Sequence, residues 1–278
     1  GKFEKVLASH LPVEGPDCFR CPYGLQRESC NAECFEPMEK TLGENSDALA
    51  GVIVEPLVQG AAGMRMYPPV YLKKLQTVCE SLGIHMIFDE IAVAFGRTGS
   101  LFVCGAHDLR PTFLCLSKGI TSGYLPLSAT LTTDEIYSAF YGEYDDMKLF
   151  IHSHSYSANP LACAVANETL KMLTENNFLE SLKPKIATLK ECGKQFEGLN
   201  GEFRQTGMIA AVELVKNNKE RHPFEKRIGY QVFLEGLKLG LFMRPLGDVV
   251  YYIPPLVISE AEIETMLNTA HDCINAVL

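Results

Sequence analysis

The chain has 278 residues, of which 47% are hydrophobic and 21% charged, and its formal net charge is −9. This composition is typical of one large or two modest globular domains with a buried core. The acidic residues outnumber the basic ones and are scattered along the chain, which argues against nucleic acid or an anionic membrane as a partner. No apolar stretch approaches the roughly 20 residues that span a bilayer, and the first residues lack the apolar core of a signal peptide. We therefore expect a cytoplasmic protein; because the first residue is not Met, a processed chain or a fragment is also expected.

Residues 1–45 are rich in proline and cysteine and predict a mostly irregular segment. Four cysteines in it have the spacing C-x2-C-x8-C-x3-C, and thiolates at such spacings can share a zinc ion or an iron–sulfur cluster. The alternative is a cysteine-rich surface segment whose thiols stay reduced. Spacing alone favours the second interpretation, so we expect no metal and keep as candidate ligands Cys18, Cys21, Cys30 and Cys34.

From residue 50 onward, short apolar runs alternate with helical patterns. Strands are predicted at 50–56, 84–90, 112–118 and 125–133. A helix after the first strand has apolar residues at helical spacing, with prolines before it and Gly83 after it. Thr133 is placed to cap a short helix, and Asn159 with Pro160 to begin a long one. Strands that alternate with helices predict an α/β fold with a mostly parallel sheet, and we assign residues 46–183 to this large domain.

The remaining residues, 184–278, predict a smaller α+β domain. Strands are expected at 208–214 and 249–253, and helices at 181–197 and near 224–239, the latter ended by Gly240. Ser259 and Glu262 have the spacing of a capping box at the start of the last helix.

Functional residue types follow three of the apolar runs in the large domain. Glu55, Asp89 and Lys118 each stand at the carboxyl end of a predicted strand, which is where open parallel sheets bind ligands. A lysine amine whose pKa is lowered by its surroundings can react with an aldehyde, and pyridoxal 5'-phosphate is the aldehyde cofactor that uses this chemistry. The cofactor's ring nitrogen needs a carboxylate, which a neighbouring Asp would supply. We interpret the small residues of "KGITSGY" as leaving room for a flat ring.

Four stretches carry a specific resemblance: "EPLVQGAAGM", "FDEIAVAFGRTGSLF", "LCLSKGITSGYLPLSATLTT" and "SANPLACAVANETL". The chain resembles the class III (ω-type) pyridoxal-phosphate aminotransferases of fold type I from about residue 45 to its C-terminus. Those enzymes have a D-E-x-x-x-G-F-G-R-T-G stretch and a lysine in S-K-G. Here Asp89 precedes Lys118 by 29 residues, the separation expected of that family. Where many relatives read D-E-V-Q, this chain reads D-E-I-A.

The resemblance implies a role for each matching residue. Lys118 would bind the cofactor aldehyde and move a proton between substrate and cofactor, Asp89 would hold the ring nitrogen, and Ile91 would pack on the ring. Arg97 and Glu55 are weaker candidates, Arg97 because it can be structural. The remaining cofactor-binding candidates are His154 and Ser155, and the substrate-binding candidates are Ser153, Arg244 and Tyr251. The alternative for His152 and His154 is a loop histidine with no role.

The resemblance also implies small-molecule substrates and a homodimer with shared active sites. The family's chains are longer at the N-terminus, so we expect this chain to lack the loop that binds the cofactor phosphate. Two alternatives remain open. One is a class III aminotransferase for ornithine-like amines, 4-aminobutyrate or glutamate semialdehyde, and the other is an inactive fragment with a cysteine-bound metal.

Overall fold

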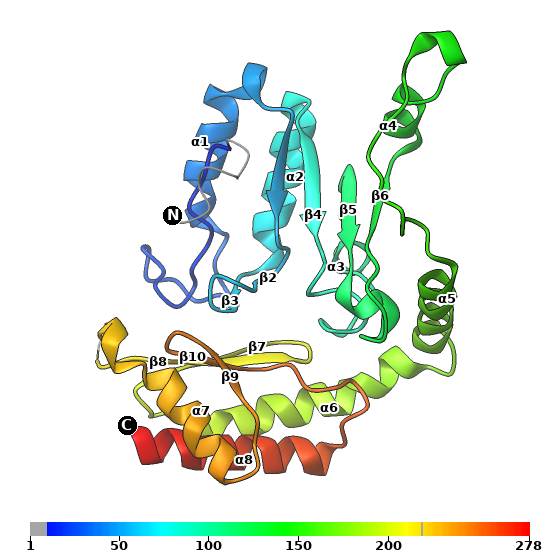
Figure 1. Cartoon of the computed structure of the whole chain (residues 1–278). Helices are drawn as coiled ribbons and strands as arrows, with labels where there is room; N and C mark the ends of the chain where they lie inside the picture. The colour runs from blue at the N-terminus through cyan, green and yellow to red at the C-terminus, as the bar shows by residue number, and fades with distance from the viewer. Residues whose placement is uncertain (1–9, 218) are drawn as a thin grey trace.

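The computed structural model describes residues 10–217 and 219–278, and its first part is built on a four-stranded sheet (Figure 1). The strand order is β1-β4-β5-β6; β1, β4 and β5 are parallel, and β6 is antiparallel to β5. The predicted mostly parallel sheet is therefore confirmed. Its strands are β1 (Gly51–Val54), β4 (His85–Asp89), β5 (Phe113–Leu116) and β6 (Ala129–Thr132).

Helix α2 (Pro69–Leu82) forms as its sequence predicts. Prolines stand at its start, and Gly83 ends it with a φ of 67°, a left-handed conformation that glycine adopts without a steric penalty. Its buried side chains recur every three or four residues and face the core of the large sheet: Tyr71, Leu72, Leu75 and Cys79.

The expectation that residues 1–45 are mostly irregular is wrong for one stretch. Helix α1 (Glu36–Glu44) begins with a proline at its first turn, and buries Met38 and Leu42, which lie four residues apart on one face. It packs on α2. Between residues 10 and 32 the structure has no helix or strand, and residues 1–9 lie outside the described part.

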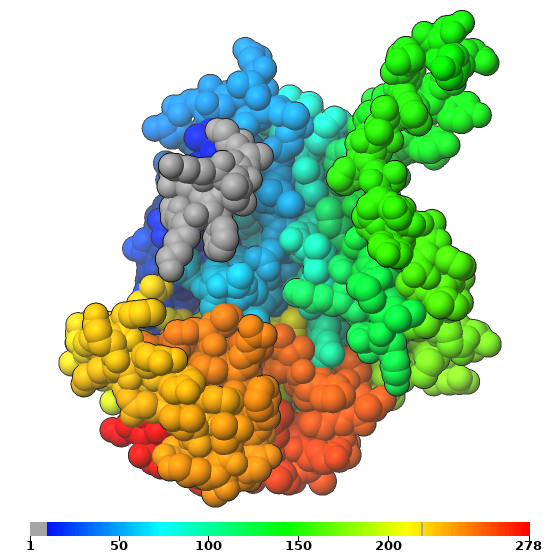
Figure 2. Space-filling view, in the orientation of Figure 1, coloured from blue at the N-terminus to red at the C-terminus, as the bar shows by residue number. Residues whose placement is uncertain are grey.

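The segment between β6 and the next long helix projects from the body as an arm, which we define as residues 133–158. Figures 1 and 2 show it standing away from the rest of the molecule. It contains α4 (Asp134–Ala139), capped as predicted by the Thr133 hydroxyl, which accepts from the Ile136 N–H. Helix α5 (Pro160–Thr174) then returns to the body, and the Asn159 side chain caps it as expected.

The second part of the chain is an antiparallel sheet with strand order β7-β8-β10-β9, covered on one face by helices (Figure 1). Two of its strands were not predicted, β7 and β9. The strands are β7 (Gly201–Thr206), β8 (Ile209–Leu214), β9 (Arg244–Leu246) and β10 (Val249–Tyr252), and the helices are α6 (Phe178–Gly193), α7 (Ile228–Lys238) and α8 (Glu260–Val277). The predicted capping box of α8 is present.

Strand β8 lies between two hydrophobic cores and contributes side chains to both. Alternate side chains of a strand point to opposite faces, and here Ile209 and Ala211 belong to the core of the large sheet. Ala210, Val212 and Leu214 belong to the second core, under the helices. Burial on both faces explains the continuous apolar run of this strand. We keep the division near residue 184 as a proposal, since α6 runs across it.

Three smaller elements complete the part of the chain that bears on the site. They are the hairpin of β2 (Val58–Gln59) and β3 (Arg65–Met66), and the short helix α3 (Val103–Ala106). Within the described residues, no helix combines the length and the apolarity needed to cross a membrane.

Candidate active site

Three of the predicted functional residues lie at one edge of the large sheet. Glu55 follows β1, Asp89 ends β4, and Lys118 lies two residues beyond Leu116, where β5 ends. These strands are adjacent and parallel, so their carboxyl ends meet at the same edge. The sheet topology therefore brings together the lysine and both carboxylates.

Asp89 and Lys118 both lie close enough to Glu55 to affect the pKa of its carboxyl. Burial raises the pKa of the Glu55 carboxyl, and the N–H of Gly60, which donates to Glu55 Oε2 at 2.9 Å, opposes this. The negative charge of Asp89 raises the same pKa further, whereas the Lys118 ammonium lowers it. Glu55 thus responds to both other members of the site.

The backbone at Lys118 has an uncommon conformation. Lys118 begins the 3-10 helix η4 (Lys118–Thr121) with a φ of 45°, in the left-handed region that non-glycine residues rarely adopt. Its side chain is exposed. A Cβ on the following residue, Gly119, would lie 2.9 Å from the Cβ of Phe95. Gly119 is therefore required by the close approach of Phe95. That the small residues of this stretch also leave room for a ring stays a prediction.

Hydroxyl groups hold the loop after Lys118 in place. Ser117 Oγ donates to the carbonyl of Leu127 at 2.8 Å, and Thr121 Oγ1 donates to the carbonyl of Leu125. Ser122 Oγ and Thr169 Oγ1 lie 3.1 Å apart, which joins the loop to α5. The small polar residues around the lysine thus fix its backbone.

Asp89 and the residues after it form a second turn at the same edge. Asp89 is half-buried, and its Oδ1 accepts from the N–H of Ile91 at 3.1 Å. The next residue, Glu90, is completely buried and accepts from the N–H groups of Val103 and Cys104, at 2.7 and 2.8 Å. Glu90 was not predicted, although a buried strand end followed by two acidic residues indicates that the second one can turn inward.

The F-G-R-T-G stretch joins the large sheet to the second part of the chain. Arg97 Nη1 donates to the carbonyl of Pro254, and the carbonyl of Arg97 accepts from the N–H of Met208 at 2.8 Å. Burial lowers the pKa of the Arg97 guanidinium. These contacts support the structural alternative for Arg97.

The structure does not bring the candidates on the arm to the strand-end site. Ser153, His154 and Ser155 are exposed. The hydrogen bonds of His154 are local, since its Nδ1 accepts from the N–H of Tyr156 and its own N–H donates to Ser157 Oγ, both at 3.1 Å. Their predicted roles concern a neighbouring subunit and stay predictions.

Arg244 and Tyr251 lie directly opposite each other on the paired strands β9 and β10. Opposed residues of an antiparallel pair share one face of the sheet. Tyr251 is half-buried and packs on the core of the large sheet, whereas Arg244 is exposed. The pairing brings together two residues that are seven positions apart in the sequence.

Arg244 also lines the larger of the two cavities described here, of about 1100 Å³. The lining includes three further arginines and several aromatic side chains, but none of Asp89, Lys118 and Tyr251. The cationic members are Arg65, Arg221, Arg227 and Arg244. Such a lining suits an anionic group with an adjoining flat or apolar part.

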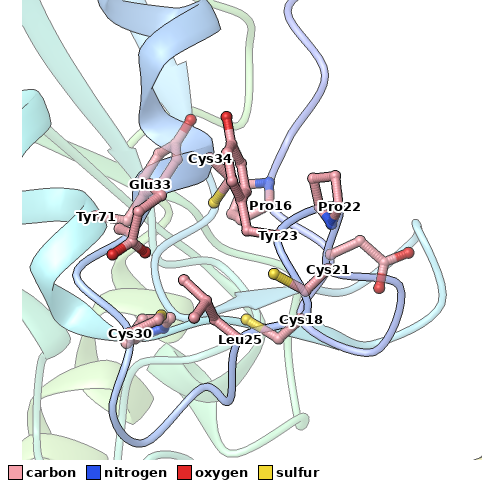
Figure 3. Close-up of a pocket in the computed structure, with 13 residues that line it drawn as sticks. Pro16, Cys18, Cys21, Pro22, Tyr23, Leu25, Cys30, Glu33, Cys34 and Tyr71 are labelled. Atoms are coloured by element: carbon pink, nitrogen blue, oxygen red, sulfur yellow. The ribbon is translucent and has the colours of Figure 1, made fainter.

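The four candidate cysteine ligands line the other, smaller cavity (Figure 3). All four are free thiols and half-buried. Among the described residues, no group of three or more His, Cys, Asp or Glu side chains stands already arranged as a metal site.

The sequence as a whole decides the family. Residues 4–274 match the profile of the class-III aminotransferases. The chain belongs to the class-III aminotransferase family. The match includes the sheet edge with Asp89 and Lys118.

Two relatives carry the same name. The chain is 43% identical to the adenosylmethionine-8-amino-7-oxononanoate aminotransferase of Geobacter sulfurreducens, which it matches over 100% of its own length and 62% of the relative. It is 41% identical to the enzyme of that name from Aquifex aeolicus, over 97% of the chain and 60% of the relative. The chain therefore spans about three-fifths of the length of these class-III aminotransferases.

Solved structures agree with the fold. The crystal structure of the adenosylmethionine-8-amino-7-oxononanoate aminotransferase from Methanocaldococcus jannaschii superposes with a TM-score of 0.85 at 37% identity, over 88% of this chain and 58% of that one. An amine transaminase from an uncultivated Pseudomonas species, in its PLP-bound form, has a TM-score of 0.86 at 28% identity, over 95% of this chain and 61% of that one. The predicted α/β fold of pyridoxal-phosphate-dependent transferases is confirmed.

Proposed function

We propose that this chain serves a transaminase of biotin synthesis, which transfers the amino group of S-adenosylmethionine to 8-amino-7-oxononanoate to give 7,8-diaminononanoate. The observation that carries the proposal is the sheet edge where Lys118 and Asp89 meet, in a chain 43% identical to a relative of that name. The late stretch "MRPLGDVVYYIPP" and the D-E-I-A variant resemble the same kind of enzyme. We also propose a cytoplasmic location.

The residues at the sheet edge fit pyridoxal 5'-phosphate. Lys118 offers an exposed amine, and Asp89 offers a half-buried carboxylate on the neighbouring strand. A carboxylate is the group that keeps a pyridine nitrogen protonated, and an amine is the group that binds an aldehyde. Bound pyridoxal 5'-phosphate supplies an electron-withdrawing ring that stabilises negative charge on the substrate carbon.

The chain's own residues divide the remaining work. Lys118 Nζ takes and returns the proton of the reacting carbon. Asp89 would hold the cofactor's ring nitrogen, and its Oδ1 is fixed by the Ile91 N–H, so this carboxylate is oriented in advance. Ile91 would pack against the cofactor ring, and Glu55 would orient nearby groups.

Arg244 and Tyr251 would serve the substrate. A guanidinium binds a carboxylate through two parallel hydrogen bonds, and both proposed substrates carry a carboxylate. Arg244 is exposed and borders the 1100 Å³ cavity, so its fork is free to receive one. Tyr251 lies opposite Arg244 in the sheet and packs against the core of the large domain.

We further propose a homodimer, in which the arm of one subunit reaches the site of the other. In the single chain the arm exposes large apolar side chains to solvent. Tyr144, Met147 and Ile151 are 91%, 82% and 85% exposed. A patch of this kind marks an interaction surface. Ser155 and His154 on the arm would then contact the cofactor of the neighbouring subunit, and Ser153 its substrate.

The amino donor tests the proposed function. Purified protein is loaded with pyridoxal 5'-phosphate, mixed with S-adenosylmethionine or with glutamate, and then given 8-amino-7-oxononanoate, while mass spectrometry follows 7,8-diaminononanoate. We expect product with S-adenosylmethionine. If glutamate alone gives product, the donor assignment is overturned while the class of reaction stands. The same assay on the chain alone and on a longer protein that includes it measures what this part does by itself.

A further inference from the structure

The cysteines of the C-x2-C-x8-C-x3-C motif, which the proposed reaction does not use, converge on one small cavity. Cys18, Cys21, Cys30 and Cys34 all line it, although they span 17 residues of irregular chain (Figure 3). The cavity has a volume of about 10 Å³, the space of about one water-sized sphere. It therefore has room for a single ion.

The thiols are near enough to influence one another. Burial, followed by the nearby thiols of Cys30, Cys34 and Cys21, raises the pKa of Cys18 to about 12, whereas Arg27 lowers it. Burial, followed by Cys30 and Cys21, raises the pKa of Cys34 as well. These interactions agree with the geometry, in which the four cysteines surround one cavity.

The two carboxylates at the cavity already have partners. Asp17 accepts from the backbone N–H of Arg20, at 3.1 Å, and forms an ion pair with Arg65, at 3.4 Å. Glu33 accepts from the N–H of Asn31 at 3.2 Å. The buried Tyr71 hydroxyl, which also lines the cavity, has no hydrogen-bond partner among the described residues. The thiols are the lining groups that suit a soft metal ion.

A cross-link would stabilise the cysteine-rich segment, residues 10–32. These residues have no helix or strand, yet they connect the β2–β3 hairpin with the antiparallel sheet of the second part of the chain. Gln59 Nε2 donates to the carbonyl of Pro16 at 2.7 Å on one side, and Arg27 Nη2 donates to the carbonyl of Gln205 at 3.0 Å on the other. An ordered stretch of this length without regular structure is uncommon unless something holds it.

We propose that Cys18, Cys21, Cys30 and Cys34 bind one zinc ion as a structural tetrathiolate site. Four thiols lose their protons to solvent as one Zn²⁺ binds, which leaves a site of net charge −2 beside the Arg27 guanidinium. The side chains do not stand in this arrangement already, so the thiols turn about χ1 as the ion binds; binding and ordering are coupled. A tetrathiolate set suits zinc or an iron–sulfur cluster, and the small cavity favours the single ion.

Metal content tests the site. The chain is produced with zinc in the medium and passed over a chelating resin, and zinc, iron and sulfide are measured per chain. We expect about one zinc and no iron, with the zinc lost in Cys18→Ser and in Cys30→Ser. Cys163→Ser is the matched control, because this half-buried cysteine lies on α5 outside the cavity, and it should keep the zinc. Less than about half an equivalent in the wild-type chain after exposure to excess zinc, or iron with sulfide, overturns the proposal.

A second measurement needs no variant. Cobalt(II) added in place of zinc should give the strong visible absorption of tetrahedral thiolate coordination. A stronger chelator should abolish it and lower the midpoint of thermal unfolding, and zinc should restore the midpoint. An intact mass that shows two hydrogen atoms lost per cysteine pair would identify disulfides instead, and would overturn the proposal. These readouts are independent of transaminase activity, so the site and the proposed function can fail separately.

Discussion

At the residue scale, Lys118 combines an uncommon backbone conformation with an exposed side chain. Its φ of 45° costs on the order of 1–3 kcal/mol and persists because the hydroxyls of Ser117 and Thr121 fix the loop. The strained residue stands two positions beyond the end of β5, so the left-handed turn begins at the lysine itself.

Replacing this lysine tests its role directly. We expect Lys118→Ala to lower the transamination rate by about 10²-fold or more, because the group that moves the proton is gone. Borohydride should link pyridoxal 5'-phosphate to the wild-type chain and to Lys171→Ala, an exposed lysine on α5, but not to Lys118→Ala. Intact mass spectrometry measures the linkage. Equal labelling of all three proteins contradicts the assignment.

Glu90 is a buried carboxylate that holds two backbone N–H groups. We expect Glu90→Ala to lower the free energy of unfolding by about 3 kcal/mol, because the N–H groups of Val103 and Cys104 lose their acceptor inside the protein. Urea denaturation measures the change. The control is Glu80→Ala, an exposed residue on α2, which should change stability by less than about 0.5 kcal/mol.

Glu90 also makes stability depend on pH. Burial raises the pKa of its carboxyl in the folded chain. The folded state therefore holds a proton that the unfolded state has lost, and stability falls as pH rises from the ordinary glutamate pKa, about 4.3, through the raised value. Gln does not titrate, so Glu90→Gln should gain stability relative to the wild type as pH rises through this window. Urea midpoints of both proteins from pH 4 to 8 check the sign. A midpoint of Glu90→Gln that falls relative to the wild type as pH rises would contradict it.

At the scale of elements, the turn after β4 and the loop after β5 pack against each other through Gly119 and Phe95. A Cβ at position 119 would lie 2.9 Å from the Phe95 Cβ and 3.0 Å from its ring. We expect Gly119→Ala to cost about 1–3 kcal/mol of stability and to weaken cofactor retention, because Lys118 moves with the loop. Gly105→Ala on α3 is the control, since nothing lies within 4 Å of its added Cβ. Thermal unfolding and cofactor content after gel filtration measure both effects.

Which elements could be predicted depended on the reason for their burial. Strands β1, β4, β5 and β8 are apolar runs, and their side chains meet a hydrophobic core, so the sequence pattern was sufficient. Strand β7 was missed because Arg204 in it is buried through ion pairs, which an apolar pattern does not reveal. Strand β9 was missed because it has three residues, one of them a proline. Pairing, not propensity, makes both of them strands.

The same distinction applies to the site. Asp89 and Lys118 were found from their places after apolar runs and from the motifs that contain them. Glu90 was missed because its carboxylate accepts hydrogen bonds from the backbone N–H groups at the start of α3. A long turn separates that helix from Glu90 in the sequence. The role of Gly119 depends on Phe95, 24 positions earlier in the chain, and no local pattern connects the two residues.

At the scale of the whole molecule, a buried ion-pair network joins the antiparallel sheet to the β2–β3 hairpin. Arg204 Nη2 donates to Glu213 Oε2 at 2.8 Å and to the carbonyl of Gly63 at 2.6 Å, and Arg204 Nε donates to the carbonyl of Met64 at 2.7 Å. Arg20, from the cysteine-rich segment, forms an ion pair with Glu213. One guanidinium therefore connects β7 and β8 with the turn of the β2–β3 hairpin. Strand β8 also contributes side chains to both hydrophobic cores, so the network lies where the two cores meet.

Removing the Arg204 guanidinium should destabilise the antiparallel sheet and the β2–β3 hairpin together. We expect Arg204→Ala to lower the free energy of unfolding by about 3–5 kcal/mol, because Glu213 stays buried with one partner fewer and two carbonyls lose their donors. Arg204→Lys should recover only part of the loss, since an ammonium cannot make the same fork of hydrogen bonds. The control is Arg110→Ala, an exposed arginine. Urea unfolding should also show a smaller m-value for Arg204→Ala, because the two cores no longer unfold as one unit. A loss below about 1 kcal/mol with an unchanged m-value would mean that the cores hold each other through β8 alone.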